Sequence, residues 1–484
     1  MRFSDQFALE LDQGQLDFVD IDTTNDVPVY IDPRAIRNQR GEWSEACEGL
    51  LQSYFHELLV AIKAADKERI AHLVRALGSE PNETHLGQSV GPSRGRGIGP
   101  AKRAEIVNAL ASSAAAKTGL LQDLEETALF IRGIDRDFVS DMTTSIIRGP
   151  LISYTQDMCE LHGVEMSEQW SGWMWDPDAL DWVGSTVLLP RGPEGKLILV
   201  PKSIVRSQLI TNFGTYYRDY LRPLLVEEEM DANSSLVQIL KDKRKRVYFK
   251  DVAKKYGDDK AAAERETQKR PQALEKMREG VSGSAYPPYT NPDFEERTGA
   301  PAVDFEELLE PLGSILPGRG GATSYHRAAA AILTAVFDAA VGNMRLEAPL
   351  HGGRKRLDIR YDNIAPRGFF HWLAMHYDAA TIVVECKNYA ADPANPELDQ
   401  LIGRFSNNRG RIGFLVCRSI SDRALFEQRC RDTAVDGNGF IIALDDADLR
   451  DLAHWAKENA ALSRTASLAF PMLRERFGAL IGEA

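Results

Sequence analysis

A carboxylate and an ammonium stand two positions apart at the point where an apolar run ends. Residues 382–384 are the β-branched triplet Ile-Val-Val, which is typical of a buried strand, and Glu385, Cys386 and Lys387 follow directly. Alternate side chains of a strand point to the same face, so Glu385 and Lys387 are expected side by side. Because two charges at the edge of an apolar core are costly unless they pair or bind a cation, this pair is the first candidate for chemistry.

A second acid lies upstream in a similar setting. Asp358 is flanked by Leu357 and Ile359, which alternate with it as in a strand. This acid, the later Glu-x-Lys and a following glutamine in an expected helix form an ordered set. The set resembles the PD-(D/E)xK nucleases, which share the restriction-endonuclease-like fold. Asp358 would match the family's first Asp, although Leu357 replaces the usual proline. Glu385 and Lys387 would match its E-x-K, and Gln400 its helical glutamine. The resemblance covers roughly residues 325–452.

The resemblance implies a metal-dependent phosphodiesterase. Asp358 and Glu385 would hold Mg²⁺ or Mn²⁺, ions that prefer hard carboxylate oxygens, and the backbone carbonyl of Cys386 would add a ligand. Lys387 would orient or deprotonate the attacking water and offset charge. Gln400 completes the predicted catalytic set.

The third metal ligand has three candidates. Segments 345–350 and 356–361 are expected to form a hairpin around residues 351–353, and a symmetric register would place Glu347 opposite Asp358 on one face. A slip of one residue would remove it. Many family members instead carry a glutamate on the first helix, where this chain has Tyr325 and His326. The choice stays open between Glu347, His326 and water.

Basic side chains near these segments are candidates for phosphate contacts. Helix spacing places Arg404 on the face of Gln400, and a local patch of positive charge would attract a phosphate backbone. The residues assigned to this role are Arg356, Arg404, Arg409 and Arg411.

Length and pattern indicate an α/β protein, α+β overall, with more than one domain. A chain of 484 residues exceeds one ordinary domain. We expect an N-terminal α+β sensing or recognition domain over residues 1–230, and a charged helical segment with linker over 231–300. A nuclease-like domain with a mixed sheet flanked by helices is expected over 301–484.

Two further stretches carry positive charge. A Gly-rich segment over residues 87–100 opens a helix, and its amides with Arg94, Arg96 and Lys102 would suit a phosphate-bearing ligand. An ordered surface loop is the alternative, because the segment matches no standard nucleotide motif. The run over residues 241–246 reads Lys-Asp-Lys-Arg-Lys-Arg. Mixed charge on either side favours a solvated helix there.

Composition narrows the class of protein. The net charge of −13 argues against general adhesion to nucleic acid, although a local basic site is compatible with it. Five scattered cysteines offer no zinc or disulfide pattern. No apolar run is long enough to span a membrane, and no apolar signal core follows Met1. A cytoplasmic protein is the expectation.

The resulting hypothesis is a Mg²⁺- or Mn²⁺-dependent endonuclease acting on nucleic acid, with DNA favoured. By fold-level analogy it resembles bacterial restriction or anti-phage defence nucleases. Its expected partners are nucleic acid, further copies of the chain or a defence-system protein. Two alternatives remain: a non-catalytic nucleic-acid-binding or scaffold protein that keeps the fold, and a nucleotide-activated effector nuclease with the Gly-rich segment as its ligand site.

Overall fold

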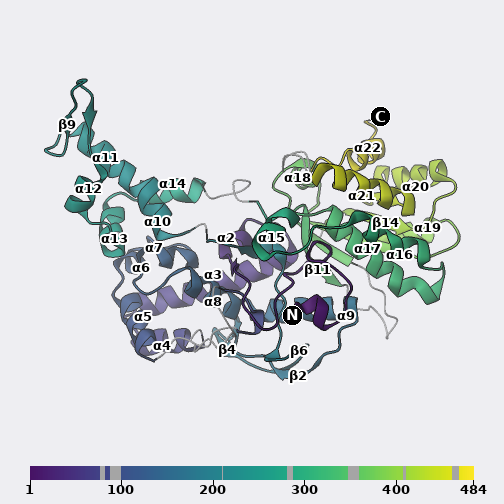
Figure 1. Cartoon of the computed structure of the whole chain (residues 1–484), viewed down its shortest axis with the longest axis horizontal. Coiled ribbons are helices and arrows are strands. Elements are labelled where there is room, and N and C mark those ends of the chain that lie inside the picture. The colour runs from purple at the N-terminus through teal and green to yellow at the C-terminus, as the bar shows by residue number, and fades with distance from the viewer. Residues whose placement is uncertain are drawn as a thin grey trace.

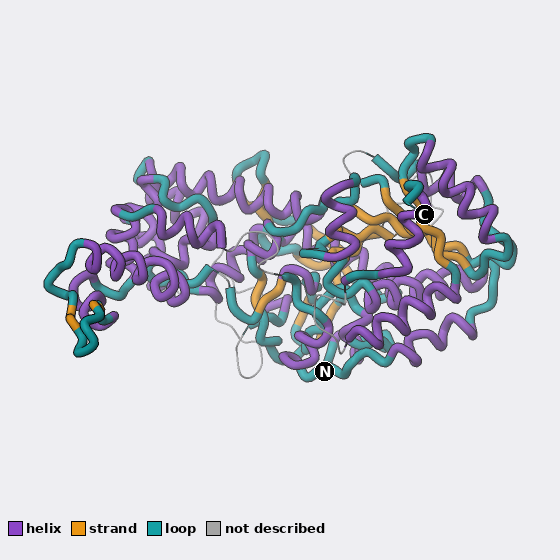
Figure 2. The backbone as a smooth tube through the Cα atoms, turned by 90° about the horizontal axis from the view of Figure 1, so that it is seen from above, coloured by secondary structure: helices purple, strands orange, loops and turns teal. Residues whose placement is uncertain are grey.

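The computed structural model describes residues 1–76, 82–87, 100–209, 211–280, 287–346, 359–406, 410–460 and 468–483. Two parts are distinct in Figure 1, namely a body that contains both chain ends and a helical arm that projects from it. Figure 2, seen from above, again shows the arm standing away from the body.

A five-stranded mixed sheet forms the C-terminal part of the body. Its strand order is β11-β12-β13-β14-β15. β11 and β12 are antiparallel, as are β12 and β13, whereas β14 runs parallel to β13 and β15 parallel to β14. This confirms the predicted mixed sheet. The strands are β11 Val341–Leu346, β12 Ile359–Asn363, β13 Thr381–Lys387, β14 Ile412–Cys417 and β15 Phe440–Leu444.

Helices cover both faces of this sheet, as its apolar residues on both sides require. α17 packs on β13 from one face, and the following helices connect and flank the parallel strands. The Ala-rich α17 buries Ala328 to Val336 without interruption, which lets it approach the sheet closely. The helices are α15 Asn291–Thr298, α16 Phe305–Ser314, α17 Ala322–Val336, α18 Gly368–His376, α19 Asn395–Ile402, α20 Arg423–Val435, α21 Asp446–Ala460 and α22 Pro471–Leu480.

The N-terminal part of the body is mainly helical. Its helices are α1 Phe3–Gln6, α2 Pro33–Arg37, α3 Glu42–Lys63, α4 Lys67–Arg75, α5 Pro100–Ser112, α6 Ala114–Thr118, α7 Thr127–Phe130, α8 Arg136–Ile146 and α9 Arg148–His162. Short strands form two-stranded pairs: β1 Tyr30–Ile31 with β8 Val205–Arg206, β2 Ser167–Trp170 with β5 Thr186–Leu189, β3 Met174–Asp176 with β4 Asp181–Val183, and β6 Arg191–Gly192 with β7 Gly195–Lys196.

The arm comprises residues 211–280. Its elements are α10 Phe213–Tyr216, a π-helical turn at Tyr217–Leu221, α11 Arg222–Asp231, β9 Gln238–Ile239, β10 Lys245–Arg246, α12 Phe249–Tyr256, α13 Lys260–Lys269 and α14 Gln272–Gly280. β9 and β10 form an antiparallel hairpin that lies at the far end of the arm (Figure 1). The helix predicted over residues 241–246 is therefore wrong, because residues 241–244 turn the chain and residues 245–246 form the second strand of the hairpin.

A buried polar network joins the N-terminal part to the sheet at a β-bulge. The register of β11 shifts between Gly342 and Arg345, and Asn343 there has a φ of 53°. Its buried side-chain amide donates to Gln39 Oε1 at 2.7 Å and to Asp362 Oδ2 at 3.1 Å. Gly41 fits against the same carboxylate, because a Cβ at this position would lie 1.9 Å from Asp362 Cγ. The N-terminal part thus fixes the strand pair β11–β12.

A second buried acid, Asp17, connects the same parts. Its Oδ2 accepts hydrogen bonds from Met344 N at 2.7 Å and from Tyr154 OH at 2.8 Å. Burial raises the pKa of the Asp17 carboxyl to about 6 from its usual 3.8. Between these two values the folded chain keeps a proton that the unfolded chain has released, so rising pH removes stability over this window.

We expect Asp17→Asn to remove this pH dependence. The amide does not titrate, and its oxygen can accept both hydrogen bonds. The unfolding free energy of the variant, relative to the parent, should therefore increase by up to about 3 kcal/mol between pH 4 and pH 7. Urea unfolding at several pH values measures this difference in unfolding free energy. Asp178→Asn, which removes an exposed carboxylate, is the control for the change in net charge. A difference that stays constant with pH would contradict the prediction.

Candidate active site

Three predicted residues meet at the end of β13. Lys387 Nζ donates to Gln400 Oε1 at 2.9 Å and also to Glu385 Oε1. Gln400 Nε2 in turn donates to Glu385 Oε1 at 3.0 Å. Glu385 is 1% exposed and Lys387 is 7% exposed. The three side chains form a closed polar triangle on an otherwise apolar strand.

Strand and helix geometry produce the triangle. Glu385 and Lys387 share one face of β13, as their spacing predicts, and Glu385 lies opposite Leu415 of β14. α19 crosses this face between the two parallel strands. Its Leu398 and Leu401 are buried, and they hold the intervening Gln400 over the Glu385 carboxylate. Gln400 lies in a helix, as expected, in the last turn of α19.

The other face of β13 positions the Cys386 backbone. The Cys386 side chain is buried. His326 Nε2, from α17, donates to Cys386 O at 2.8 Å. His326 was a candidate third metal ligand and Cys386 O another proposed ligand. The structure places these two groups in contact with each other.

Asn388 ties a second segment to the end of β13, and no sequence argument singled it out. Its Nδ2 donates to Leu316 O and to Gly318 O, both at 2.9 Å, and Gly318 N donates to Asn388 O at 2.7 Å. Gly321 allows this approach, since a Cβ there would lie 2.4 Å from Leu316 O. The closely spaced glycines at 318–321, just before a helix, are the available sequence signal.

Several predicted residues lie outside the described part of the chain. They are Glu347, Arg356, Asp358 and Arg409, together with Arg94 and Arg96 of the Gly-rich segment. The described ladder between β11 and β12 ends with Leu346 opposite Ile359. The second acid and the third ligand therefore stay predictions.

Two of the remaining basic candidates, Arg411 and Lys102, lie away from the triangle, and the role of Arg404 stays a prediction. Arg411 precedes β14, whose Ile412 lies opposite Ile382 near the start of β13. It is therefore at the other end of the sheet from Lys387. Arg404 lies just beyond the end of α19. Lys102 is exposed on α5 in the N-terminal part.

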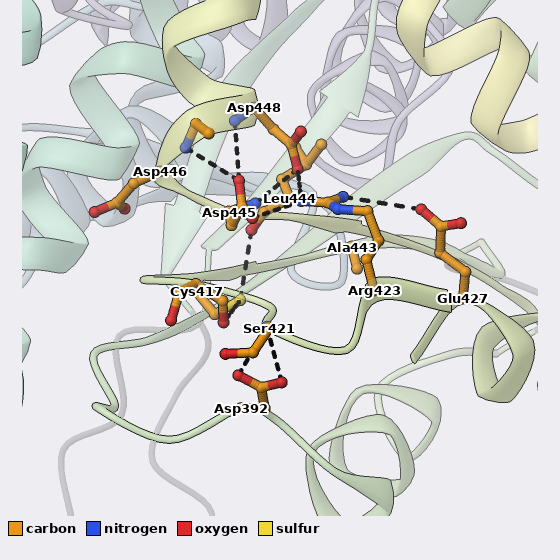
Figure 3. Close-up of polar contacts among 12 residues, drawn as sticks. Asp392, Cys417, Ser421, Arg423, Glu427, Ala443, Leu444, Asp445, Asp446 and Asp448 are labelled. Atoms are coloured by element: carbon orange, nitrogen blue, oxygen red, sulfur yellow. Dashed lines mark hydrogen bonds and ion pairs between the residues drawn. The ribbon is translucent and has the colours of Figure 1, made fainter. Parts of the chain in front are cut away.

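A group of aspartates follows β15 at the same edge of the sheet (Figure 3). Asp445 Oδ1 accepts from Asp448 N at 3.0 Å, and Asp448 Oδ2 accepts from Asp445 N at 2.9 Å. Arg423 Nη2 bonds to both carboxylates, at 2.5 and 3.0 Å. Asp446 points away from this pair and accepts from Tyr325 OH at 2.9 Å. These acids cap α21 and pair with arginine.

The described residues hold one hard carboxylate, Glu385, at the predicted metal position. Within the described ranges, no three or more His, Cys, Asp and Glu residues are placed to bind a metal ion. A carboxylate and a backbone carbonyl are suitable donors for Mg²⁺ or Mn²⁺. The fit of a metal therefore depends on Asp358.

Comparisons with known proteins identify one matching family and leave its function open. A family described as a domain of unknown function (DUF8370) matches residues 8–212, which lie in the N-terminal part. No curated protein and no solved structure matches the chain. Across the described ranges, no helix has both the length and the apolar character needed to cross a membrane.

Proposed function

We propose that the chain is a metal-dependent endonuclease of the PD-(D/E)xK class that hydrolyses phosphodiester bonds of DNA. The observation that carries the proposal is the triangle of Glu385, Lys387 and Gln400 at the end of β13. A buried ion pair of this kind contributes little net stability compared with apolar residues of similar volume. The presence of such a pair at the end of the central strand is easier to explain by a chemical role than by a contribution to folding.

The arrangement of the sheet supports the same class. The E-x-K strand, β13, lies in the centre between an antiparallel neighbour, β12, and a parallel neighbour, β14. α17 lies before the sheet in the chain, and α19 connects the two parallel strands. This layout is compatible with a restriction-endonuclease-like core, and Asp358 directly precedes β12.

Each described residue has a role in this proposal. Glu385 offers a carboxylate whose position is fixed by hydrogen bonds from Lys387 and Gln400. Lys387 supplies a positive charge beside the scissile phosphate and orients the attacking water. Gln400 Oε1 holds Lys387 by accepting a hydrogen bond from its ammonium group, and His326 fixes the Cys386 carbonyl by donating to it. A bound Mg²⁺ or Mn²⁺ would supply Lewis-acid activation of water and phosphate.

Incubation of the full chain with nucleic acid tests the proposal. The substrates are supercoiled, linear and single-stranded DNA and an RNA of matched length, each with Mg²⁺, Mn²⁺ or EDTA. We expect cleavage of DNA with either metal and none with EDTA. Tight binding without cleavage under every condition would overturn the proposal in favour of a non-catalytic binding protein. A second series with added nucleotides measures whether a nucleotide activates cleavage.

A further inference from the structure

The end of the arm carries a concentration of positive charge that contrasts with the rest of the molecule. We define the basic tip as residues 238–254, which include the β9–β10 hairpin and most of α12. The basic tip holds seven Lys and Arg residues and two Asp residues, a local charge of +5, in a chain of net charge −13. The net negative charge already keeps the protein soluble, so solubility does not explain a patch of positive charge.

The basic side chains of the tip are exposed and mostly not neutralised. Residues 241–246 are all exposed. Arg244 pairs with Asp242 at 2.6 Å, and Lys255, just beyond the tip, pairs with Glu229 at 2.5 Å. No carboxylate in the described part of the chain forms an ion pair with the other basic residues of this run: Lys241, Lys243, Lys245, Arg246, Lys250 and Lys254. Their charge is available to a partner.

The tip has a defined shape rather than being an unstructured tail. Leu240 N donates to Arg244 O at 2.9 Å and closes the hairpin. Lys243 has a φ of 66°, a conformation that favours Gly or Asn. A lysine placed there at the apex of the turn suggests that its charge is useful.

The arm is anchored firmly at its base. Glu264 Oε1 accepts from Ala115 N at 2.6 Å, and Arg278 Nε donates to Glu126 Oε1 at 2.7 Å. Figures 1 and 2 both show the hairpin at the opposite end of the molecule from the sheet. The tip is thus held at a fixed position, far from the candidate active site.

We propose that the basic tip binds the phosphate backbone of double-stranded DNA and holds a long substrate at a second point. The inference rests on the proposed function for the choice of DNA among polyanions. A two-stranded ribbon fits the major groove, and basic side chains around it would contact the flanking phosphates. Arg246 and Lys250 lie over the Tyr248 ring, at 4.8 and 5.8 Å from its centroid, so the tip presents charge rather than an open stacking platform for single strands.

A membrane surface is the competing partner. Ile239 and Phe249 are 72% and 53% exposed. Two separate apolar side chains do not form the continuous apolar face with which amphipathic elements enter a bilayer. Charge without such a face favours DNA.

The test measures binding without cleavage. We expect Lys243→Asn, Lys245→Gln and Arg246→Gln, combined in the full chain, to weaken binding to a labelled duplex in EDTA by about 10-fold to 100-fold. The slope of log Kd against the logarithm of the salt concentration should decrease by up to about 3, because each lost phosphate contact lowers this slope by about 0.9. Asn suits the left-handed conformation at position 243.

The control removes three exposed lysines elsewhere. Lys63→Gln, Lys117→Gln and Lys276→Gln make the same change in net charge away from the tip. Parent-like binding by this control, with weakened binding by the tip variant, supports the proposal. Equal affinity and salt slope for the parent and the tip variant would overturn it. Binding of the tip to phosphatidylserine vesicles but not to duplex would replace DNA with a membrane partner.

Because EDTA prevents metal-dependent cleavage, the result is independent of nuclease activity. Tip-dependent binding by a chain that never cleaves would support the tip while overturning the proposed function. DNA cleavage by the chain, with duplex binding that the tip substitutions do not change, would support the proposed function while overturning the role of the tip. Circular dichroism and thermal unfolding of both triple variants establish that the arm still folds.

Discussion

Glu385→Gln should reduce metal-dependent DNA cleavage by at least about 100-fold while leaving the fold intact. The amide keeps the size of the side chain, and its oxygen can still accept from Lys387 and Gln400. It removes the negative charge that would hold the cation. A 100-fold loss corresponds to about 2.7 kcal/mol of transition-state stabilisation. Initial rates across a Mg²⁺ and Mn²⁺ series, together with calorimetric metal titration, measure the effect.

A matched variant separates this effect from a general loss of negative charge. Asp399→Asn removes an exposed carboxylate from α19, one residue from Gln400. It should cleave at the parent rate and bind metal with the parent affinity. If Glu385→Gln also cleaves at the parent rate, the assignment of the active site to the end of β13 is incorrect.

Lys387→Met should abolish most turnover, lower stability and leave metal binding in place. Methionine preserves the apolar stem but removes the charge beside the buried Glu385 carboxylate. Removing one partner of a buried ion pair typically destabilises by about 3–5 kcal/mol. A bound cation would then replace the lost charge, so Mg²⁺ should raise the melting temperature of this variant more than that of the parent.

The double variant Glu385→Gln with Lys387→Met tests whether the two side chains act as a pair. With both charges removed, much of the stability lost in Lys387→Met should return, and a double-mutant cycle gives the coupling energy. The cycle uses the unfolding free energies, measured in EDTA, of the parent, the two single variants and the double variant. Additive effects, or loss of metal binding in Lys387→Met, would mean that Lys387 does not have the role proposed for it.

The local pattern of residues was sufficient for the buried strand β13 and for the pairing of Glu385 with Lys387. The β-branched run before Glu385 specified a buried strand, and the two-residue repeat of a strand specified that Glu385 and Lys387 share a face. The strand at Ile412–Cys417 has a similar apolar run. These features depend on neighbouring residues in the sequence, so periodicity and propensity reveal them.

Contacts between distant segments were beyond such reasoning. Asn388 binds a loop about 70 residues upstream in the chain. Arg411 lies far from Lys387 because β14 runs parallel to β13, which places Arg411 beside the start of β13 and Lys387 at its end. The basic run at 241–246 has the composition of a solvated helix, yet the tertiary structure places it in the turn and second strand of a hairpin at the end of an arm. The sequence by itself determined that residues 381–387 form a buried strand and that Glu385 and Lys387 share one of its faces, because these features depend on local periodicity. Only the tertiary structure decided how Gln400, His326 and Asn388 surround the end of β13 and where the basic tip lies, because packing between distant segments fixes those positions.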